Sequence, residues 1–509
     1  MTLPMSITLR EMLRGLDTSD APKGRDTPIF GLAYDSRQVR PGWLFVAIRG
    51  FHADGHQYVA QAVEAGATAV VADLRYWAGA EIGVPLIRVA DSRVALAALA
   101  ANFYQRPGLS LRTVGITGTK GKSTTTDLVS QILEGGGFST GMISTVDFKV
   151  GVRRWPNSTR QSTPEAPEIQ GLLREMADAG CDYAVIEATS HALSARWNRL
   201  GGCYFDVAVF LNITHEHLDY HGSFEQYRAD KTRLFEMLGE GEQGDVWAIA
   251  NADTPSHAYF LAAAPARARR LTFGVQASAD VRAHEVSAGP GGATLRVTTP
   301  WGEARLRLQL PGSFNVSNAL AALSVALSQG VPLGRAAAAL EAVPGIRGRM
   351  QPVNMGQPFD VIVDYAHNPD SFDQVLGMLR PLTPGRIIAV FGSAGERDRA
   401  KRPIQGAIAG RYADLLVLTD EDPRGEDPAA IIAEIAEGAE QAGKRAGDGY
   451  LCISDRAEAI RTAMAAARPG DLVLLLGKGH EGNIIYAGST IPWDEAESAR
   501  DALRALGYV

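Results

Sequence analysis

The chain has 509 residues, which is too long for one hydrophobic core and favours about three domains. Its composition, 46% hydrophobic and 21% charged, is that of a globular protein, and the net charge of −7 argues against a general nucleic-acid binder. Three scattered cysteines and the lack of any membrane-spanning run favour a cytoplasmic protein without a disulfide framework, a cysteine zinc site or membrane insertion.

The N-terminal part is expected to form a small α/β unit. Its β-like apolar runs are residues 44–48, 69–72 and 85–89, and its helical patterns are residues 58–65 and 94–104. The polar segments DSRQVRPG and RGFHADGH separate these elements, and both are typical of turns. A linker at residues 105–108 leads into the next domain.

A glycine-rich segment, TGTKGKS at residues 117–123, follows a strand-like run and precedes a helical pattern. This order is typical of a polyphosphate site, because loop N–H groups and a helix N-terminus attract the anion. Gly118 and Gly121 allow the backbone to approach closely. Lys122 can reach the terminal phosphates, and Ser123 offers a hydroxyl to a magnesium ion. The loop is shorter than the standard one and indicates a nucleotide without deciding the reaction.

Two further apolar runs of this part end in polar groups. Residues 183–186 lead into Glu187, and residues 207–211 lead into NITHEHLDYHG, which contains His217. Short continuous runs predict buried parallel strands, and ligands lie beyond the carboxyl ends of such strands. Glu187 and His217 could hold a divalent cation together with the Ser123 hydroxyl. A zinc site of the histidines in that segment is disfavoured, because the spacing is not HExxH and no cysteine is near.

The following residues predict a β-hairpin and a long helix. Residues 293–310 alternate apolar and polar side chains about a Pro-Trp-Gly turn, as a hairpin does. The helix that follows carries Asn315 and Asn318 near its start, where capping is their simplest role. A second domain boundary is expected near Gly345.

After that boundary the pattern restarts. Strand-like runs occur at residues 361–363, 387–391, 415–418 and 472–476, and each is followed by a polar loop. In order, these loops are DYAHNPDS, GSAGERDRAKRP, TDEDPRGEDP and GKGHEG. The predicted fold class is therefore α/β with three domains. These are a small α/β domain at residues 1–110, a phosphate-loop domain with a parallel sheet at 111–345, and a Rossmann-like doubly wound domain at 346–509.

The ordered motifs resemble those of the Mur ligase family, most closely the members that add the third amino acid of the peptidoglycan stem peptide. The motifs are DSR, ADGH, TGTKGKST, STP, EATSHAL, NITHEHLDYHG, YRADKTRLF, GSFNVSNALAAL, GRM, DYAHNP, GERDRAKRP, EDPR and GKGHE. The resemblance implies ATP-dependent amide-bond formation, through an acyl phosphate, between UDP-N-acetylmuramoyl-L-alanyl-D-glutamate and a diamino acid. ATP and Mg²⁺ are the implied cofactors, and we expect a monomer.

The resemblance also implies roles for individual residues. It implies catalytic roles for Lys122, Glu187, His217 and Lys231, and metal binding by Ser123, Glu187, His217 and Lys231 as a carbamate. The implied ATP contacts are Gly118, Thr119, Lys120, Gly121, Lys122, Ser123, Thr124, Asn318, Arg349 and Asp364. The implied UDP-substrate contacts are Ser36, His52, Ala53, Ser162, Thr163, Thr189 and Arg199, with Arg196 as the alternative to Arg199. The implied amino-acid contacts are Arg397, Glu421, Asp422, Pro423, Arg424, Gly477 and Glu481.

The identity of the diamino acid stays open. Members that add meso-diaminopimelate usually carry DNPR, where this chain has EDPR from Glu421 to Arg424. The retained Arg424 favours a second carboxylate, whereas Asp422 adds negative charge that favours a terminal ammonium. We place meso-diaminopimelate first, with L-lysine or L-ornithine close behind.

Other functions share part of this pattern. A folylpolyglutamate synthase or a ligase adding D-alanyl-D-alanine would have the same phosphate loop and metal groups, but the motifs EDPR, GERDRAKRP and GKGHE argue against both. A non-catalytic nucleotide-binding protein would be expected to have lost Lys122, Glu187, His217 or Lys231, and all four are present.

Overall fold

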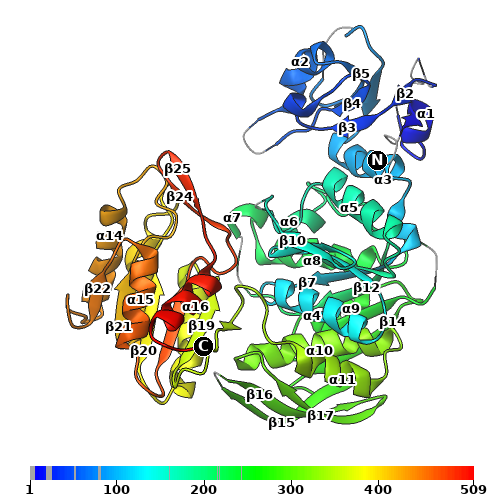
Figure 1. Cartoon of the computed structure of the whole chain (residues 1–509). Coiled ribbons are helices and arrows are strands. Elements are labelled where there is room, and N and C mark those ends of the chain that lie inside the picture. The colour runs from blue at the N-terminus through cyan, green and yellow to red at the C-terminus, as the bar shows by residue number, and fades with distance from the viewer. Residues whose placement is uncertain are drawn as a thin grey trace. The chain divides into compact units, whose positions relative to one another are not determined.

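The computed structural model describes residues 6–18, 24, 26–50, 53–77, 82–159, 161–214, 216, 218–241, 244–289 and 291–509. The chain divides into two compact units. Figure 1 labels many of their helices and strands. Unit 1 comprises Met1–Asp280 and Ala321–Val331, and unit 2 comprises Val281–Leu320 and Pro332–Val509. Within the described ranges, no helix is both long and apolar enough to cross a membrane.

Unit 1 begins with a parallel sheet in the order β3-β4-β5-β6, formed by Gly31–Ala33, Trp43–Val46, Ala67–Asp73 and Leu86–Val89. Leu44 and Val46 pack with α1 (Leu9–Met12) and α3 (Ser92–Phe103), whereas Phe45 and Ala47 pack with α2 (Val59–Glu64). This alternation is that of a strand buried on both faces. The smaller elements are β1 (Ile7–Thr8), β2 (Pro28–Ile29), η1 (Ser36–Gln38), η2 (Gly55–Tyr58) and η3 (Pro107–Ser110).

The second sheet of unit 1 has the order β10-β9-β8-β11-β7-β12-β13-β14. The strands β8, β11, β7, β12, β13 and β14 are parallel to one another. The pairs β8–β9 and β9–β10 are antiparallel. The bounds are β7 Arg112–Thr117, β8 Thr140–Ile143, β9 Asp147–Val150, β10 Arg153–Pro156, β11 Tyr183–Glu187, β12 Phe205–Phe210, β13 Trp247–Asn251 and β14 Arg269–Gly274. Because β7 lies between β11 and β12, the strand order reverses beside it, which is where open α/β sheets bind ligands.

Helices cover this sheet. α4 (Lys122–Gly135) packs against β7, β8 and β11, and α5 (Ala166–Asp178), α8 (Phe224–Glu236) and α9 (His257–Ala263) share a core with β11 and β12. Gly115 in β7 permits a close approach of α8, since a Cβ atom there would lie 2.5 Å from Leu234 Cδ1. Two short helices, α6 (Ser190–Leu193) and α7 (Leu218–His221), follow the carboxyl ends of β11 and β12.

Unit 2 begins with the antiparallel strands β15 (Val281–Gly289), β16 (Gly292–Thr299) and β17 (Gly302–Leu308), of which β16 and β17 form the predicted hairpin. Helices α10 (Ser313–Ser328) and α11 (Leu333–Ala342) follow, and α10 contributes residues to both units. The predicted long helix is therefore confirmed.

The rest of unit 2 is a doubly wound sheet in the order β18-β19-β23-β20-β21-β22. Helices α12, α13 and α14 share one core, and α15 and α16 share another. The strands are β18 Gln351–Pro352, β19 Asp360–Asp364, β20 Ile387–Phe391, β21 Leu415–Leu418, β22 Tyr450–Cys452 and β23 Leu472–Leu476, with a separate pair, β24 Asn483–Tyr486 and β25 Ser489–Pro492. The helices are α12 Pro369–Leu379, η4 Arg380–Leu382, α13 Lys401–Tyr412, α14 Pro428–Gln441, α15 Arg456–Ala466 and α16 Glu495–Ala505. The predicted α/β class is confirmed.

Candidate active site

The phosphate loop joins the carboxyl end of β7 to the first turn of α4. Gly121 has φ +84° directly before α4, a conformation that favours glycine. The Lys122 ammonium donates to the carbonyl oxygens of Gly118 at 3.1 Å and Thr119 at 3.0 Å, so it lies over the loop. The predicted phosphate-binding residues Gly118, Thr119, Lys120, Gly121, Lys122, Ser123 and Thr124 are all in this loop or turn.

Asn212 lies two residues beyond the end of β12 and holds the phosphate loop by hydrogen bonds from this neighbouring strand. Its Oδ1 accepts from the backbone N–H groups of Thr119 at 3.1 Å and Lys120 at 2.9 Å, and its Nδ2 donates to the Lys120 carbonyl at 3.0 Å. Sequence reasoning did not single out Asn212. Its place just beyond the carboxyl end of a predicted strand was the available signal.

Glu187 ends β11, and its Oε2 atom collects three hydrogen bonds. The hydroxyl of Ser123 donates at 2.8 Å, and the backbone N–H and hydroxyl of Thr145 each donate at 2.9 Å. The carboxylate is buried, with 2% of the residue exposed. The predicted pair of Ser123 and Glu187 is thus in contact, and Thr145 is a partner that sequence reasoning missed.

Lys231 lies in α8 with 1% of its surface exposed. Its Nζ donates to the Gly118 carbonyl at 2.8 Å and lies 4.7 Å from the ring centre of Tyr227. Burial, and then the nearby charge of Lys122, hold the pKa of Lys231 well below its usual value. Both effects disfavour the charged ammonium form of this side chain.

The predicted residues His52 and His217 lie outside the described residues. Within the described part, no group of three or more His, Cys, Asp or Glu side chains could hold a metal ion. The neighbouring His221 is buried and bonded through Nδ1 to Asp230 at 2.7 Å and through Nε2 to Ser190 at 3.1 Å. The oxygens of Ser123 and Glu187 are donors of the type that Mg²⁺ accepts.

Several predicted substrate residues surround the carboxyl end of β11. The Thr163 hydroxyl donates to the Glu187 carbonyl at 2.7 Å and lies 3.1 Å from the Thr189 hydroxyl. Arg199 donates through Nη1 to the Thr163 carbonyl at 3.1 Å, whereas the Arg196 guanidinium lies 5.5 Å from the ring centre of Trp197. Arg199 therefore contacts the threonine loop, residues 162–164, which includes the half-buried Ser162.

The other predicted substrate residues lie in the N-terminal sheet region. Ser36 begins η1 and donates its hydroxyl to Gln61 Oε1 at 3.1 Å. Ala53 is exposed, and its carbonyl accepts from the Gly50 N–H at 2.8 Å.

Three predicted nucleotide contacts lie in unit 2. Asn318, in α10, donates to Asn315 Oδ1 at 2.9 Å. Asp364 ends β19 and accepts from the N–H groups of Met350 and Ala366, each at 2.8 Å, while burial raises the pKa of its carboxyl. The Arg349 guanidinium lies 4.9 Å from the ring centre of Tyr365.

A buried lysine sits between the loops that follow β21 and β23. Lys478 has no exposed surface, and its Nζ donates to Asp422 Oδ1 at 2.9 Å and to Glu481 Oε2 at 2.7 Å. Asp422 Oδ1 also accepts from the Ile485 N–H at 3.0 Å. The extra negative charge of Asp422 is therefore offset inside the protein. Lys478 lies in the predicted loop GKGHEG, was given no role from the sequence, and forms ion pairs with both carboxylates.

The same loops carry the remaining predicted amino-acid contacts. Glu421 is buried with its Oε2 unpaired among the described residues, and burial raises the pKa of its carboxyl. Gly477 has φ +99°, and a Cβ atom there would lie 2.7 Å from Glu421 Oε2. Pro423 is buried, the Nε of Arg424 is buried without a partner in the described chain, and Arg397 is exposed.

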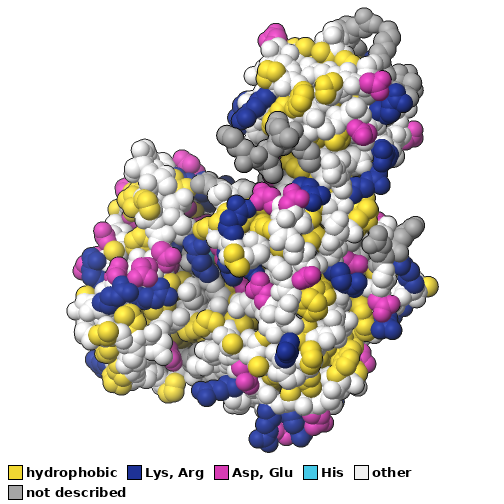
Figure 2. Space-filling model, turned by 45° about the vertical axis from the view of Figure 1, so that its right-hand side comes forward, with side chains coloured by type: hydrophobic (Ala, Val, Ile, Leu, Met, Phe, Trp, Pro, Cys, Tyr) yellow, Lys and Arg dark blue, Asp and Glu magenta, His cyan; other side chains and the backbone are white. Residues whose placement is uncertain are grey.

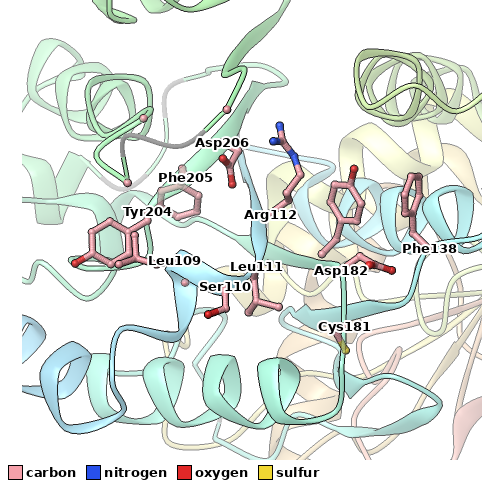
Figure 3. Close-up of a pocket in the computed structure, with 15 residues that line it drawn as sticks. Leu109, Ser110, Leu111, Arg112, Phe138, Cys181, Asp182, Tyr204, Phe205 and Asp206 are labelled. Atoms are coloured by element: carbon pink, nitrogen blue, oxygen red, sulfur yellow. The ribbon is translucent and has the colours of Figure 1, made fainter.

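A cavity of about 490 Å³ opens at the amino ends of β7, β11 and β12 (Figure 3). Its lining includes Arg112, Asp182 and Asp206. This edge is opposite to the one that carries the phosphate loop, so the cavity is separate from the site described above.

On the face shown in Figure 2, Lys and Arg side chains lie interspersed with Asp and Glu rather than forming one basic patch.

Comparison with known proteins agrees with this geometry. Profiles of the Mur ligase family match residues 28–104 (Mur ligase family, catalytic domain), 116–326 (Mur ligase middle domain) and 348–479 (Mur ligase, glutamate ligase domain). The chain is 63% identical over 486 residues to a UDP-N-acetylmuramyl-tripeptide synthetase of Roseiflexus sp. (strain RS-1), covering 94% of this chain and 95% of that one.

Two further relatives are informative. The chain is 41% identical over 487 residues to a UDP-N-acetylmuramoyl-L-alanyl-D-glutamate--2,6-diaminopimelate ligase of Geobacillus thermodenitrificans (strain NG80-2), covering 95% and 96% of the two chains. A solved structure of a ligase with that name superposes with a TM-score of 0.69 at 29% identity, over 99% of this chain and 100% of the other. This chain therefore belongs to the Mur ligase family, a family of ATP-dependent ligases.

Proposed function

We propose that this protein uses ATP to join a diamino acid to the γ-carboxyl of UDP-N-acetylmuramoyl-L-alanyl-D-glutamate. The observation that carries the proposal is the cluster at the carboxyl ends of β7 and β11, where Lys122, Ser123, Glu187 and the buried Lys231 surround one phosphate loop. Relatives named for this reaction match the chain almost from end to end. A cytoplasmic location and a monomeric state are parts of the same proposal.

The proposed reaction has two steps. The substrate γ-carboxylate attacks the γ-phosphorus of ATP, the bond from that phosphorus to the bridging oxygen breaks, and ADP leaves. The diamino acid then attacks the acyl carbon as a neutral amine, an amide bond forms, and inorganic phosphate leaves with the C–O electron pair and accepts the proton that the amine releases. In the first step Lys122 and the loop N–H groups stabilise the charge on the transferring phosphoryl group.

We propose that Ser123 and Glu187 hold Mg²⁺, since their oxygens meet at 2.8 Å beside the phosphate loop. When bound, the ion neutralises negative charge on the ATP phosphates. His217 and Lys231, the latter as a carbamate, are the other two proposed metal ligands. Uptake of CO₂ by the Lys231 amine would turn a neutral group into an anion, which suits a cation site.

The proposal assigns the UDP-substrate to Ser36, His52, Ala53, Ser162, Thr163, Thr189 and Arg199. It assigns nucleotide contacts in unit 2 to Asn318, Arg349 and Asp364. Burial of the Asp364 carboxyl, with its two backbone donors, makes it a rigid acceptor at the end of β19.

For the diamino acid, we propose meso-diaminopimelate ahead of L-lysine and L-ornithine. As an unpaired negative charge, Asp422 would favour a substrate with a terminal ammonium. Its ion pair with Lys478 offsets that charge and removes this preference. Arg424 keeps a buried Nε without a partner in the described chain and can hold a distal carboxylate. Arg397 and Glu481 are the proposed partners of the amino-acid carboxylate and ammonium.

The catalytic part of the proposal is tested by Glu187→Gln, which keeps the side-chain shape and removes the charge. Substrate-dependent phosphate release should fall about 100-fold or more, because a metal ligand and its field are lost. The matched control is Glu134→Gln in α4, a carboxylate that pairs with Lys149, and it should retain wild-type turnover. Wild-type turnover in Glu187→Gln would overturn the assignment.

The amino-acid part is tested by Asp422→Asn and Arg424→Ala. Asp422→Asn should change the ratio of kcat/KM values for meso-diaminopimelate and L-lysine by less than about threefold, whereas Arg424→Ala should lower it about tenfold or more. A strong shift toward meso-diaminopimelate in Asp422→Asn would mean that the Asp422 charge acts on the substrate.

A further inference from the structure

A buried ion-pair chain links α3 to the threonine loop beside β11. Glu165 immediately precedes α5, yet its side chain makes no capping hydrogen bond to that helix. Instead it faces two arginines, Arg199 through Nη2 at 2.9 Å and Arg93 through Nη1 at 3.3 Å. Glu165 is 7% exposed and Arg93 is 8% exposed, so solvent screens these contacts little.

Arg199 is held at two points and open at a third. One Nη atom contacts Glu165 and the other donates to the Thr163 carbonyl at 3.1 Å. Its Nε is buried and has no hydrogen-bond partner among the described residues. A buried donor without a partner is costly, so this edge of the guanidinium is suited to an acceptor supplied from outside the chain.

Arg93 anchors the other side of Glu165. Its Nε and Nη2 atoms donate to the Arg49 carbonyl at 3.3 and 3.2 Å, and its guanidinium lies 3.9 Å from the ring centre of Trp197. These contacts fix Arg93 in one orientation. Glu165 therefore lies between two arginines, Arg93 and Arg199, and the fixed position of Arg93 restricts the movement of Glu165 away from Arg199.

We propose that Glu165 and Arg93 are positioning residues that hold Arg199 with its Nε edge toward a carboxylate of the UDP-dipeptide substrate. This inference rests on the proposed function, which places Arg199 at that substrate. A carboxylate between two guanidinium groups restricts the planar fork of Arg199, and such outer contacts decide how precisely a binding group is oriented. Glu165 itself does not touch the substrate.

The test compares two ligands in direct binding by calorimetry: UDP-N-acetylmuramoyl-L-alanyl-D-glutamate and UDP-N-acetylmuramoyl-L-alanine, which lacks the D-glutamate carboxylates. Glu165→Gln should bind the full ligand about tenfold more weakly than the wild type does, and should bind the truncated ligand equally well. In turnover, KM for the UDP-dipeptide should rise by the same factor, while KM for ATP stays unchanged. A purely structural role would not produce this ligand-selective loss.

Arg93→Gln is the second variant and should show a smaller loss of the same selectivity, since it removes the outer ion pair only. It also keeps the inference testable where Glu165→Gln fails to fold. The matched control is Tyr183→Phe, which removes the 3.5 Å hydrogen bond from Tyr183 to Gln329 Oε1 at the amino end of β11. It should bind both ligands as the wild type does.

The outcomes separate the inference from the function on which it rests. If the wild type binds the full ligand and both Glu165→Gln and Arg93→Gln bind it equally well, the positioning role is wrong and the proposed function stands. If both variants lose affinity for the two ligands alike, the contacts are structural and the positioning role is again wrong. If the wild type binds neither ligand, the proposed function itself fails.

Discussion

Lys231 is a buried lysine whose charge is disfavoured, and this determines what its side chain can do. Its pKa is lowered because burial removes hydration and Lys122 repels a second positive charge. We expect Lys231→Ala to reduce turnover about 100-fold or more if its proposed carbamate binds the metal, and added bicarbonate should not restore it. Phosphate release with and without bicarbonate measures this.

The control for that experiment is a buried lysine in the sheet that α8 covers. Lys149 lies in β9 and pairs with Glu134, Ser130 and Thr140, away from the phosphate loop. Lys149→Met should therefore retain activity. Full activity in Lys231→Ala would remove the carbamate from the mechanism.

Asp420 provides a pH-dependent prediction. Burial raises the pKa of its carboxyl to about 6, although Tyr486 donates a hydrogen bond to it at 3.1 Å. The folded state then binds the proton more tightly than the unfolded state. The contribution of Asp420 to the free energy of unfolding is therefore full below about pH 4 and is lost as the pH rises through 6.

Asp420→Asn removes this titration while keeping the side-chain shape. We expect the variant to be more stable than the wild type by only about 1 kcal/mol at pH 8, because solvent screens part of the charge of Asp420. Near pH 4 the two proteins should be equally stable. Thermal unfolding of both proteins between pH 4 and 8 measures the difference. A stability difference that does not change with pH would contradict the raised pKa.

Single residues also show the limit of sequence reasoning. Lys122, Ser123 and Glu187 could be placed near one another, because strand ends and glycine loops mark the ligand edge of a parallel sheet. Lys231, in the helix α8, was added to them only by the resemblance to the family. Asn212 and Thr145 could not be paired with their partners in advance, since hydrogen bonds between distant segments depend on register and loop path. The ion pair of Asp422 with Lys478 joins residues 56 positions apart and was missed for the same reason.

At the scale of elements, the two ends of α4 offer a matched pair of glycines. Gly121 precedes the helix with φ +84°, and Gly137 follows it with φ +98° and open space around its Cβ position. Alanine at either position should destabilise the protein by about 1–2 kcal/mol, because an L residue is strained at positive φ.

Only one of these substitutions should affect the nucleotide. Gly121→Ala should also raise KM for ATP about tenfold, since the strain displaces Lys122 and Ser123 from the phosphates. Gly137→Ala should leave KM for ATP unchanged. Steady-state kinetics together with thermal unfolding separate the two effects. Equal KM values for the two variants would show that the loop tolerates the strain.

Elements differed in how well they could be predicted. The strands β20, β21 and β23 begin and end at the predicted residues, because each is a continuous run of large apolar side chains between polar loops. No strand was predicted for β8 or β14, whose sequences are TGMI and RRLTFG. Glycine, threonine and arginine weaken the apolar signal there, and pairing with neighbouring strands determines the conformation instead.

For the whole molecule, the α/β class could be predicted because strands and helices alternate along the chain. The boundaries near residues 110 and 345 remain predictions. The order of strands could not be read from the sequence. It depends on which edge each new strand joins. The reversal beside β7, where open α/β sheets bind ligands, becomes visible only in the folded sheet.

The most direct test of the account is phosphate release with Mg²⁺, ATP and UDP-N-acetylmuramoyl-L-alanyl-D-glutamate, comparing meso-diaminopimelate, L-lysine and L-ornithine, with the product identified by mass. We expect turnover that requires a diamino acid and is fastest with meso-diaminopimelate, and a product mass equal to the two substrates less one water. Faster turnover with L-lysine or L-ornithine would contradict the reading of Arg424 and Asp422. No turnover with any of the three, together with activity on a folate or a D-alanyl-D-alanine dipeptide, would contradict the proposed function.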